Sequence, residues 1–264
     1  MRIVVCVKAV PGSTEVKMDP KTNTIVRDGG AAVINPFDAA ALEIALRIKD
    51  KLAIEGEPCR VTVLSMGIPA TESLLRDCVA RGADAALLLS DRAFAGADTL
   101  ATTYALSCGI ARLEEPDLVL CGKMAVDGDT AQIGPELAGS LGVPCAAGVA
   151  ALDAVGLRAV TVEREVDGGM ATVEVPLPAV LTVAKDAAQL RFASIAGIRA
   201  AEGARVDVLT ASACGADAAR TGLAGSPTQV VRSFVPERIE RGVTIEGDAA
   251  AQARAVAELL EAMA

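Results

Sequence analysis

The sequence contains no histidine and no tryptophan, and it has only one tyrosine and four phenylalanines among 264 residues. Without histidine, a Ser-His-Asp triad, a Cys-His pair and a histidine-ligated zinc are excluded. Acid–base chemistry would fall to carboxylates or lysines. We therefore expect a protein that binds a molecule rather than cleaves one, and we assign no catalytic residue and no metal ligand. A bound cofactor would carry any chemistry.

Basic grooves and aromatic stacking platforms are also missing, because the net charge is −9 and the acidic residues are dispersed. Nucleic-acid binding depends on both features, so no nucleic-acid partner is expected. The seven cysteines form no CxxC pair and are predicted to be reduced core thiols. No run approaches about 18 apolar residues, and the apolar start is too short for a signal peptide. We expect a cytoplasmic protein without a membrane span.

What the chain does contain is an alternation of apolar, strand-like runs with helical segments. This alternation predicts an α/β fold in which helices cover a parallel sheet. Strands are predicted at 3–8, 59–67, 83–90 and 117–122, and helices at 35–50, 69–81, 95–113 and 247–263. After residue 145 the pattern changes to a hairpin turned at Asp167-Gly168-Gly169 and a further strand.

The C-terminal part of the chain differs in composition from the rest. Residues 201–246 are small, polar and irregular, and such a stretch is long for a loop in a compact domain. We therefore expect one α/β domain over residues 1–200. Residues 201–264 are expected to form an extended arm and a C-terminal helix that pack on a partner.

The stretch CGKMAVDGDTAQIGP, residues 121–135, follows a predicted strand directly. Ligands of open parallel sheets bind beyond the carboxyl ends of the strands, where the strand ends at Lys8, Met66 and Lys123 and the helix start at Asn35 should converge. Free amides over Thr130–Ile133 would favour a phosphate. The same residues are compatible with a plain turn, and Asn35 with a plain helix cap. The dinucleotide-binding motif GxGxxG does not follow the first strand, and the P-loop motif GxxxxGK[ST] does not occur, so neither of these common nucleotide sites is supported.

Two motifs, DGDTAQIGP and REVDGG, carry a resemblance that covers nearly the whole chain. With VCVKAVPGSTEVKMDP (5–20), INPFDAAALEIALRIK (34–49), LPAVLTV (177–183) and GLAGSPTQV (222–230), they resemble the β-subunit of electron-transfer flavoproteins. The resemblance implies a Rossmann-like, adenine-nucleotide-binding α/β fold with an extra hairpin and a C-terminal partner-binding arm.

The resemblance also implies cofactors and partners. An α-subunit would carry the redox FAD, and this chain would hold a further nucleotide. That nucleotide is AMP in simple carriers and a second FAD in the bifurcating type, which takes electrons from NADH and passes one of each pair to ferredoxin or flavodoxin. PGSTEVKMDP, DGDTAQIGP and GLAGSPTQV favour the FAD type, whereas Phe37 favours the AMP type. By position, the nucleotide-binding residues would be Cys6, Asn35, Pro36, Phe37, Asp38, Met66, Gly122, Lys123, Met124, Ala125, Val126, Asp127, Gly128, Asp129, Thr130, Ala131, Gln132 and Ile133.

Residues 185–205 match the stretch by which the family docks an acyl-CoA or other flavin dehydrogenase, and the residues expected to dock are Leu190, Arg191, Phe192 and Ile195. The chain departs from the family here, because Leu190 and Phe192 replace the usual Pro and Tyr. Met124 and Ala171 also replace usual polar residues. A different class of function stays open: a stand-alone regulatory protein that binds AMP or ATP on the same fold.

Overall fold

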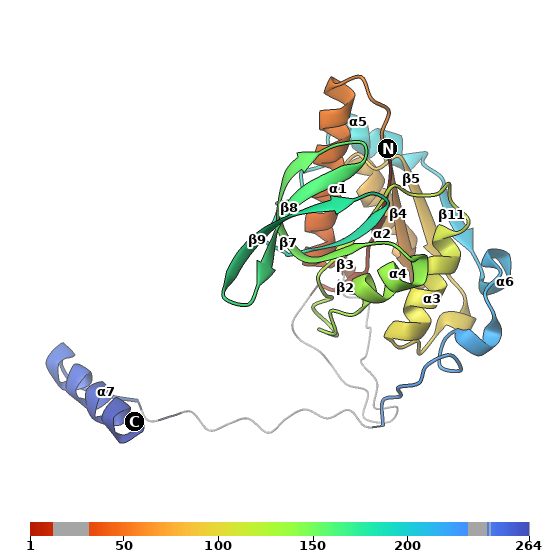
Figure 1. Ribbon diagram of the computed structural model, residues 1–264. Coiled ribbons are helices and arrows are strands. Elements are labelled where there is room, and N and C mark those ends of the chain that lie inside the picture. The colour runs from red at the N-terminus through yellow and green to blue at the C-terminus, as the bar shows by residue number, and fades with distance from the viewer. Residues whose placement is uncertain (13–31, 232–241, 243, 264) are drawn as a thin grey trace.

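The structure is a computed structural model that describes residues 1–12, 32–231, 242 and 244–263. Part of the motif over residues 5–20 therefore lies outside the described residues. A nine-stranded sheet with the order β11-β5-β4-β1-β6-β10-β7-β8-β9 forms the centre of the molecule (Figure 1). The strands from β11 to β7 run parallel, and β8 and β9 extend the sheet as an antiparallel hairpin.

The strands of this sheet are β1 (Arg2–Cys6), β4 (Arg60–Met66), β5 (Ala85–Leu89), β6 (Leu118–Gly122), β7 (Cys145–Val155), β8 (Ala159–Val166), β9 (Gly169–Pro176), β10 (Ala179–Val183) and β11 (Val206–Leu209). A separate pair consists of β2 (Ala9–Pro11) and β3 (Ala32–Ile34). The helices are α1 (Pro36–Ile54), α2 (Thr71–Ala80), α3 (Thr99–Ile110), α4 (Ile133–Leu141), α5 (Ile195–Glu202), α6 (Ala211–Cys214) and α7 (Ala249–Met263), with 3-10 turns η1 (Arg92–Phe94) and η2 (Ala218–Arg220).

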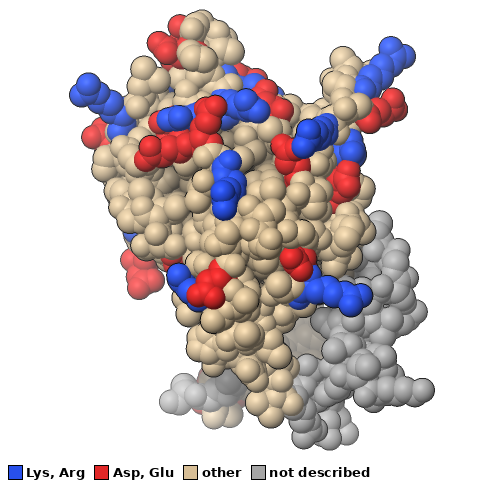
Figure 2. All heavy atoms as spheres, turned by 90° about the vertical axis from the view of Figure 1, so that its right-hand side faces the viewer, with Lys and Arg blue, Asp and Glu red and all other residues tan. Residues whose placement is uncertain are grey.

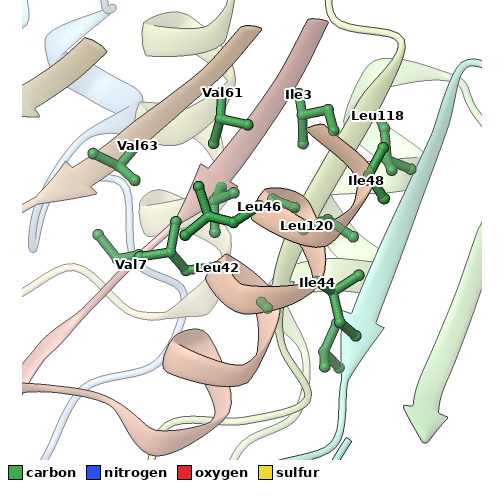
Figure 3. Packing of buried hydrophobic residues seen from close by; sticks show 14 of the residues in the cluster. Ile3, Val7, Leu42, Ile44, Leu46, Ile48, Val61, Val63, Leu118 and Leu120 are labelled. Atoms are coloured by element: carbon green, nitrogen blue, oxygen red, sulfur yellow. The ribbon is translucent and has the colours of Figure 1, made fainter. Parts of the chain in front are cut away.

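The two faces of the sheet carry two separate cores. Because side chains alternate along a strand, Ile3 and Val5 pack with Leu42 and Leu46 of α1, as Figure 3 shows for Ile3, Leu42 and Leu46. Val4 and Cys6 instead join the core beneath α3 and α4. The continuous apolar run of the first strand is thus explained by burial on both faces, and the expected α/β, Rossmann-like architecture is confirmed.

The strands and helices expected before residue 183 are all present, with ends shifted by a few residues. The hairpin turns at Asp167-Gly168, and Gly168 has a φ of +86° that favours glycine. Beyond residue 200 the structure differs from the expected arm. Residues 206–209 form β11, which pairs with β5 at the edge of the sheet, so the α/β domain extends past residue 201.

A segment that we call the strap, residues 211–228, stays attached to the domain along α3. The Arg220 guanidinium lies over the Tyr104 ring, 3.9 Å from its centroid. At the start of α3, the backbone N–H and the hydroxyl of Thr228 donate to the Asp98 carboxylate at 3.1 and 2.8 Å. The strap therefore runs along α3 and ends beside its N-terminal end. Helix α7 stands apart from the sheet in Figure 1.

Among the described residues, no helix combines the length and apolar character needed to cross a membrane.

Candidate functional site

Three segments meet at the carboxyl edge of the parallel sheet. Strands β1 and β6 are neighbours, with Val5 opposite Leu120 in the register, so the residues beyond their ends emerge side by side. The first turn of α1 lies against both strand ends. The sequence predicted this convergence for the ends of β1 and β6 and the start of α1. The side chain of Asp38 lies between the two strand ends.

The Asp38 carboxylate joins the two strand ends. One oxygen accepts the backbone N–H of Lys8 at 2.8 Å, and the other accepts that of Gly122 at 2.9 Å. The side chain is only 6% exposed. Burial raises the pKa of Asp38 to about 7, although the two amides and the neighbouring Asn35 and Lys8 act in the opposite direction. A Cβ atom added to Gly122 would overlap Asp38 and Phe37, so only glycine fits at this position.

The Asn35 side chain holds the loop that begins at the end of β6. Asn35 occupies the N-cap position of α1 but makes no side-chain cap there. Its amide instead donates to the carbonyl of Met124 at 2.8 Å, and its carbonyl accepts the N–H of Val126 at 3.2 Å. The interpretation of Asn35 as a plain helix cap is therefore wrong, because its side chain forms hydrogen bonds with the loop and none with the start of α1.

Two ion pairs flank this loop. The Lys8 ammonium lies 2.6 Å from an oxygen of Asp127, and the Lys123 ammonium lies 2.5 Å from an oxygen of Glu165 in β8. Both lysines are paired with acids rather than left as free strand-end cations. Asp127 is thereby held toward β1, and Lys123 is held toward the hairpin.

The loop over residues 126–132 is exposed, and its backbone presents donors. Asp129 and Ala131 have φ values of +49° and +53°, in the left-handed region that glycine favours and that few other residues adopt. Gln132 then returns to the right-handed region, and an alternation of this kind turns successive amides toward one point. The amides of Thr130, Ala131 and Gln132 donate to no acceptor in the described part of the chain.

Helix α4 begins directly after these amides. No side chain caps its start at Gln132, and the backbone N–H groups of a first helical turn lack helical partners. Glu136 fixes this turn from behind, because its two oxygens accept the hydroxyls of Thr99 and Thr103 at 3.0 and 2.9 Å. Exposed amides and a helix start together suit an anion such as a phosphate.

The other predicted site residues lie around this edge in different ways. Cys6 ends β1 and is buried, which together with the charge of Asp38 raises its pKa to about 12. Its thiol is therefore inert toward thiolate chemistry. Met66 ends β4 and is half-buried, Pro36 is exposed, and Phe37 is half-buried. Among the described residues, no group of three or more Cys, Asp or Glu side chains is placed to hold a metal ion.

The segment expected to dock a partner divides into an anchored part and an exposed part. The Arg191 guanidinium bonds both oxygens of Glu43 at 2.9 and 3.1 Å and lies 2.8 Å from Asp50. Leu190 packs against the core. Phe192 and Ile195, in contrast, are 89% and 76% exposed. The structure thus anchors Leu190 on the core and Arg191 on α1, and it leaves the side chains of Phe192 and Ile195 on the surface.

Sequence reasoning missed the acid that anchors this segment. Glu43 is buried on α1, and burial alone would raise its pKa, but hydrogen bonds from Arg191 and Arg47 outweigh burial and hold the pKa of Glu43 below its usual range. The available signal was a single acid inside the apolar run AAALEIAL, since a buried charge requires a partner. Asp98, which holds the strap, carried no signal beyond that of a helix cap.

The structure is that of an α/β protein with a loop of exposed amides at the carboxyl edge of its parallel sheet. Comparison with known proteins names the family, because the model of the electron transfer flavoprotein domain matches residues 22–214. The chain is 44% identical over 247 residues to the caffeyl-CoA reductase-Etf complex subunit CarD of Acetobacterium woodii, covering 94% of this chain and 92% of that protein.

Two further relatives agree. The electron transfer flavoprotein subunit beta of Megasphaera elsdenii is 42% identical, with 93% of this chain and 92% of that protein covered. Protein FixA of Azorhizobium caulinodans is 41% identical, with 99% and 94% covered. The chain therefore belongs to the electron transfer flavoprotein family, and within it to the β-subunits.

Proposed function

We propose that this chain is the β-subunit of a heterodimeric electron-transfer flavoprotein and that it binds an adenine nucleotide in the loop over Gly122–Ile133. The observation that supports this most strongly is the set of exposed amides at Thr130, Ala131 and Gln132, which lie directly before a helix start without a side-chain cap. The residues fit a nucleotide, because these donors would bind its phosphates. The hydroxyl of Thr130 and the carboxylate of Asp129 are exposed and suited to ribose hydroxyls.

We further propose that the nucleotide is FAD rather than AMP. The motifs DGDTAQIGP and GLAGSPTQV favour this type, and one relative of 44% identity is named as part of a reductase-Etf complex. A bound FAD would supply redox chemistry that the side chains lack, accepting electrons from NADH for distribution to a high-potential acceptor and to ferredoxin or flavodoxin. The protein's own residues bind and orient the nucleotide and keep the strand ends in place.

The surface of the chain supports an α-subunit partner. Figure 2 shows charged side chains gathered toward the end of the molecule at which the parallel strands begin, whereas the opposite end of that face carries few. Exposed apolar residues belong to α3 and to the strap and its continuation, namely Leu100, Leu223, Val230 and Val231. Helix α7 exposes Val256, Leu259 and Leu260 at helical spacing. We propose that the α-subunit covers these residues.

A dehydrogenase partner is proposed for the segment around Phe192. Its exposed aromatic ring stands next to the anchored Arg191, and a rigidly placed exposed aromatic is typical of binding surfaces. An acyl-CoA dehydrogenase or another flavin dehydrogenase would be the partner, as the family resemblance implies.

The experiment that tests the function is purification of the chain with its α-subunit, followed by acid release and identification of the nucleotides. One FAD and one AMP would make the chain the structural half of a simple carrier. A stable homo-oligomer that binds AMP or ATP and does not associate with an α-subunit would instead favour the stand-alone regulatory protein. Reduction of a complex containing two FADs by NADH tests the bifurcating role, and a failure of that reduction would contradict it.

A further inference from the structure

We propose that Asp38 is a positioning residue: its carboxylate fixes the ends of β1 and β6 and so shapes the site loop without touching the nucleotide. The inference rests on the proposed function, since it concerns the site in which the nucleotide would bind. It assigns Asp38 a different role from the direct contact that the family resemblance implies.

Both oxygens of the Asp38 carboxylate already accept a main-chain donor. Each accepts one backbone N–H, from Lys8 beyond β1 and from Gly122 at the end of β6. The side chain is almost completely buried. A buried carboxylate whose two oxygens already accept main-chain donors has no exposed face to offer a ligand, whereas it fixes two strand ends relative to each other.

The site loop is tied to the residues around Asp38. Asn35, three residues before Asp38 on the chain, holds the loop through Met124 and Val126, and Lys8 holds it through Asp127. The loop therefore begins at Gly122, whose amide Asp38 binds. It is held further along by Asn35 and by Lys8. Because the amides of Lys8 and Gly122 are occupied, phosphate binding falls to the amides of residues 130–132.

Protonation of Asp38 would disturb this arrangement. An ionised carboxylate accepts the N–H groups of both Lys8 and Gly122. When the carboxyl is protonated, one oxygen carries a hydrogen that faces one of these N–H groups, and that hydrogen bond is lost. Burial raises the pKa of Asp38 to about 7. The titratable groups around Asp38 are the ammonium of Lys8, whose charge lowers the Asp38 pKa, and the thiols of Cys6, Cys78 and Cys121, on which the charge of Asp38 acts. Burial raises the pKa of all three thiols, to about 12 for Cys6 and Cys78, so these thiols stay neutral near pH 7.

The test compares Asp38→Asn with Glu43→Gln, both in the complex with the α-subunit. Glu43 is a matched control because it is a carboxylate equally buried on the same helix, 5% against 6% exposed, but it bonds Arg191 away from the site. Two readouts are needed: hydrogen–deuterium exchange of the Lys8 and Gly122 amides, and the dissociation constant of the released and re-added nucleotide.

For Asp38→Asn we expect a loss of exchange protection at Lys8 or Gly122 together with at least a tenfold weaker nucleotide affinity, and for Glu43→Gln neither change. Weaker affinity with unchanged protection would overturn the proposal, because it would mean that Asp38 contacts the nucleotide directly. Unchanged affinity with lost protection would also overturn it, since the strand ends would then not shape the site.

The wild-type complex provides a second test if the variant does not fold. As the pH is lowered from 8 to 6, protection of one of the two amides, Lys8 or Gly122, should fall relative to the other after correction for intrinsic exchange. The loss is local to the amide that faces the protonated oxygen, even though protonation stabilises the fold as a whole, and nucleotide affinity should fall with it. A pH-independent protection would contradict the proposal. If the wild-type complex contains no nucleotide beyond that of the α-subunit, the proposed function fails, while the protection of the two amides still tests whether Asp38 fixes the strand ends.

Discussion

The Arg191 guanidinium spans both oxygens of the Glu43 carboxylate and fastens the segment after residue 185 to helix α1. The backbone N–H of Arg191 also donates to Glu43, at 3.1 Å. One buried acid thus fixes both the side chain and the main chain next to the exposed Phe192.

Replacement of Arg191 by Ala should destabilise the domain by about 3 kcal/mol, because it leaves a buried carboxylate without its main partner. The pKa of Glu43 is lowered in the folded state, so this contribution is present above the unfolded pKa and is lost as the pH falls through the folded value. The unfolding free energies of wild type and Arg191→Ala should therefore converge once the pH has fallen below the lowered folded-state pKa of Glu43. A difference that persists there would contradict the ion-pair explanation.

Replacement of Phe192 by Ser should leave stability within about 0.5 kcal/mol of wild type, since the side chain lies on the surface. The apparent Michaelis constant for electron transfer with the dehydrogenase should rise at least tenfold. The matched control is Ile54→Ser, which removes an equally exposed apolar side chain, 88% against 89%, at the C-terminal end of α1. Equal effects of the two substitutions would leave docking at Phe192 without support.

Helix α4 offers a comparison between two glycines. A methyl group at Gly134 would overlap Thr182 and approach Cys121, whereas Gly139 has open space around it. Gly134→Ala should cost about 3 kcal/mol through overpacking beneath the site loop. Gly139→Ala should stabilise the protein by about 1 kcal/mol through helix propensity. Thermal unfolding measures both, and a neutral Gly134→Ala would mean that α4 packs less closely on β10.

The strap should depend on Asp98, which caps α3 through the N–H of Ala101 and also accepts both donors of Thr228. Asp98→Ala should cost about 1–2 kcal/mol and should speed proteolytic cleavage within residues 221–231. Thr228→Ala, which removes the hydroxyl but leaves the cap, should speed cleavage less and should hardly change stability. Identical cleavage rates in all three proteins would show that Asp98 does not hold the strap.

Asp38 should make the fold less stable as the pH rises. Its pKa is raised in the folded state to about 7, so its stabilising contribution is present at low pH and is lost through the range between the unfolded and folded values. The pKa difference corresponds to about 4 kcal/mol between pH 4 and pH 8. The wild type should therefore lose stability over this range relative to Asp38→Asn, and parallel pH profiles would contradict the raised pKa.

The regular part of the fold could be predicted from the sequence because it depends on repeated local signals. Apolar runs such as that of Ile3 to Val7 marked the buried strands, and the helix predicted from residue 35 is present as α1. Strand β11 was missed because it has only four residues, pairs on one side with β5, and lies after a polar stretch that resembles a loop. Its position is set by tertiary pairing rather than by local propensity.

The site could be located but not described from the sequence. Convergence of Lys8, Gly122 and Asn35 is expected from the direction of parallel strands, whereas the partners of Asn35 and Asp38 are not. Which of several nearby amides a side chain accepts depends on the backbone geometry of three separate segments. The left-handed conformation of Asp129 and Ala131 could not be predicted either, because glycine is the residue that usually indicates a positive φ and neither residue is a glycine.

The central claim, that the loop over Gly122–Ile133 holds FAD, is tested most directly by the nucleotide content of the complex with the α-subunit. We expect two FADs and no AMP per heterodimer, with Asp38→Asn losing one of the two. One FAD and one AMP would place a structural nucleotide in the loop and would withdraw the NADH chemistry. A single FAD, with no second nucleotide, would contradict the assignment of the site itself.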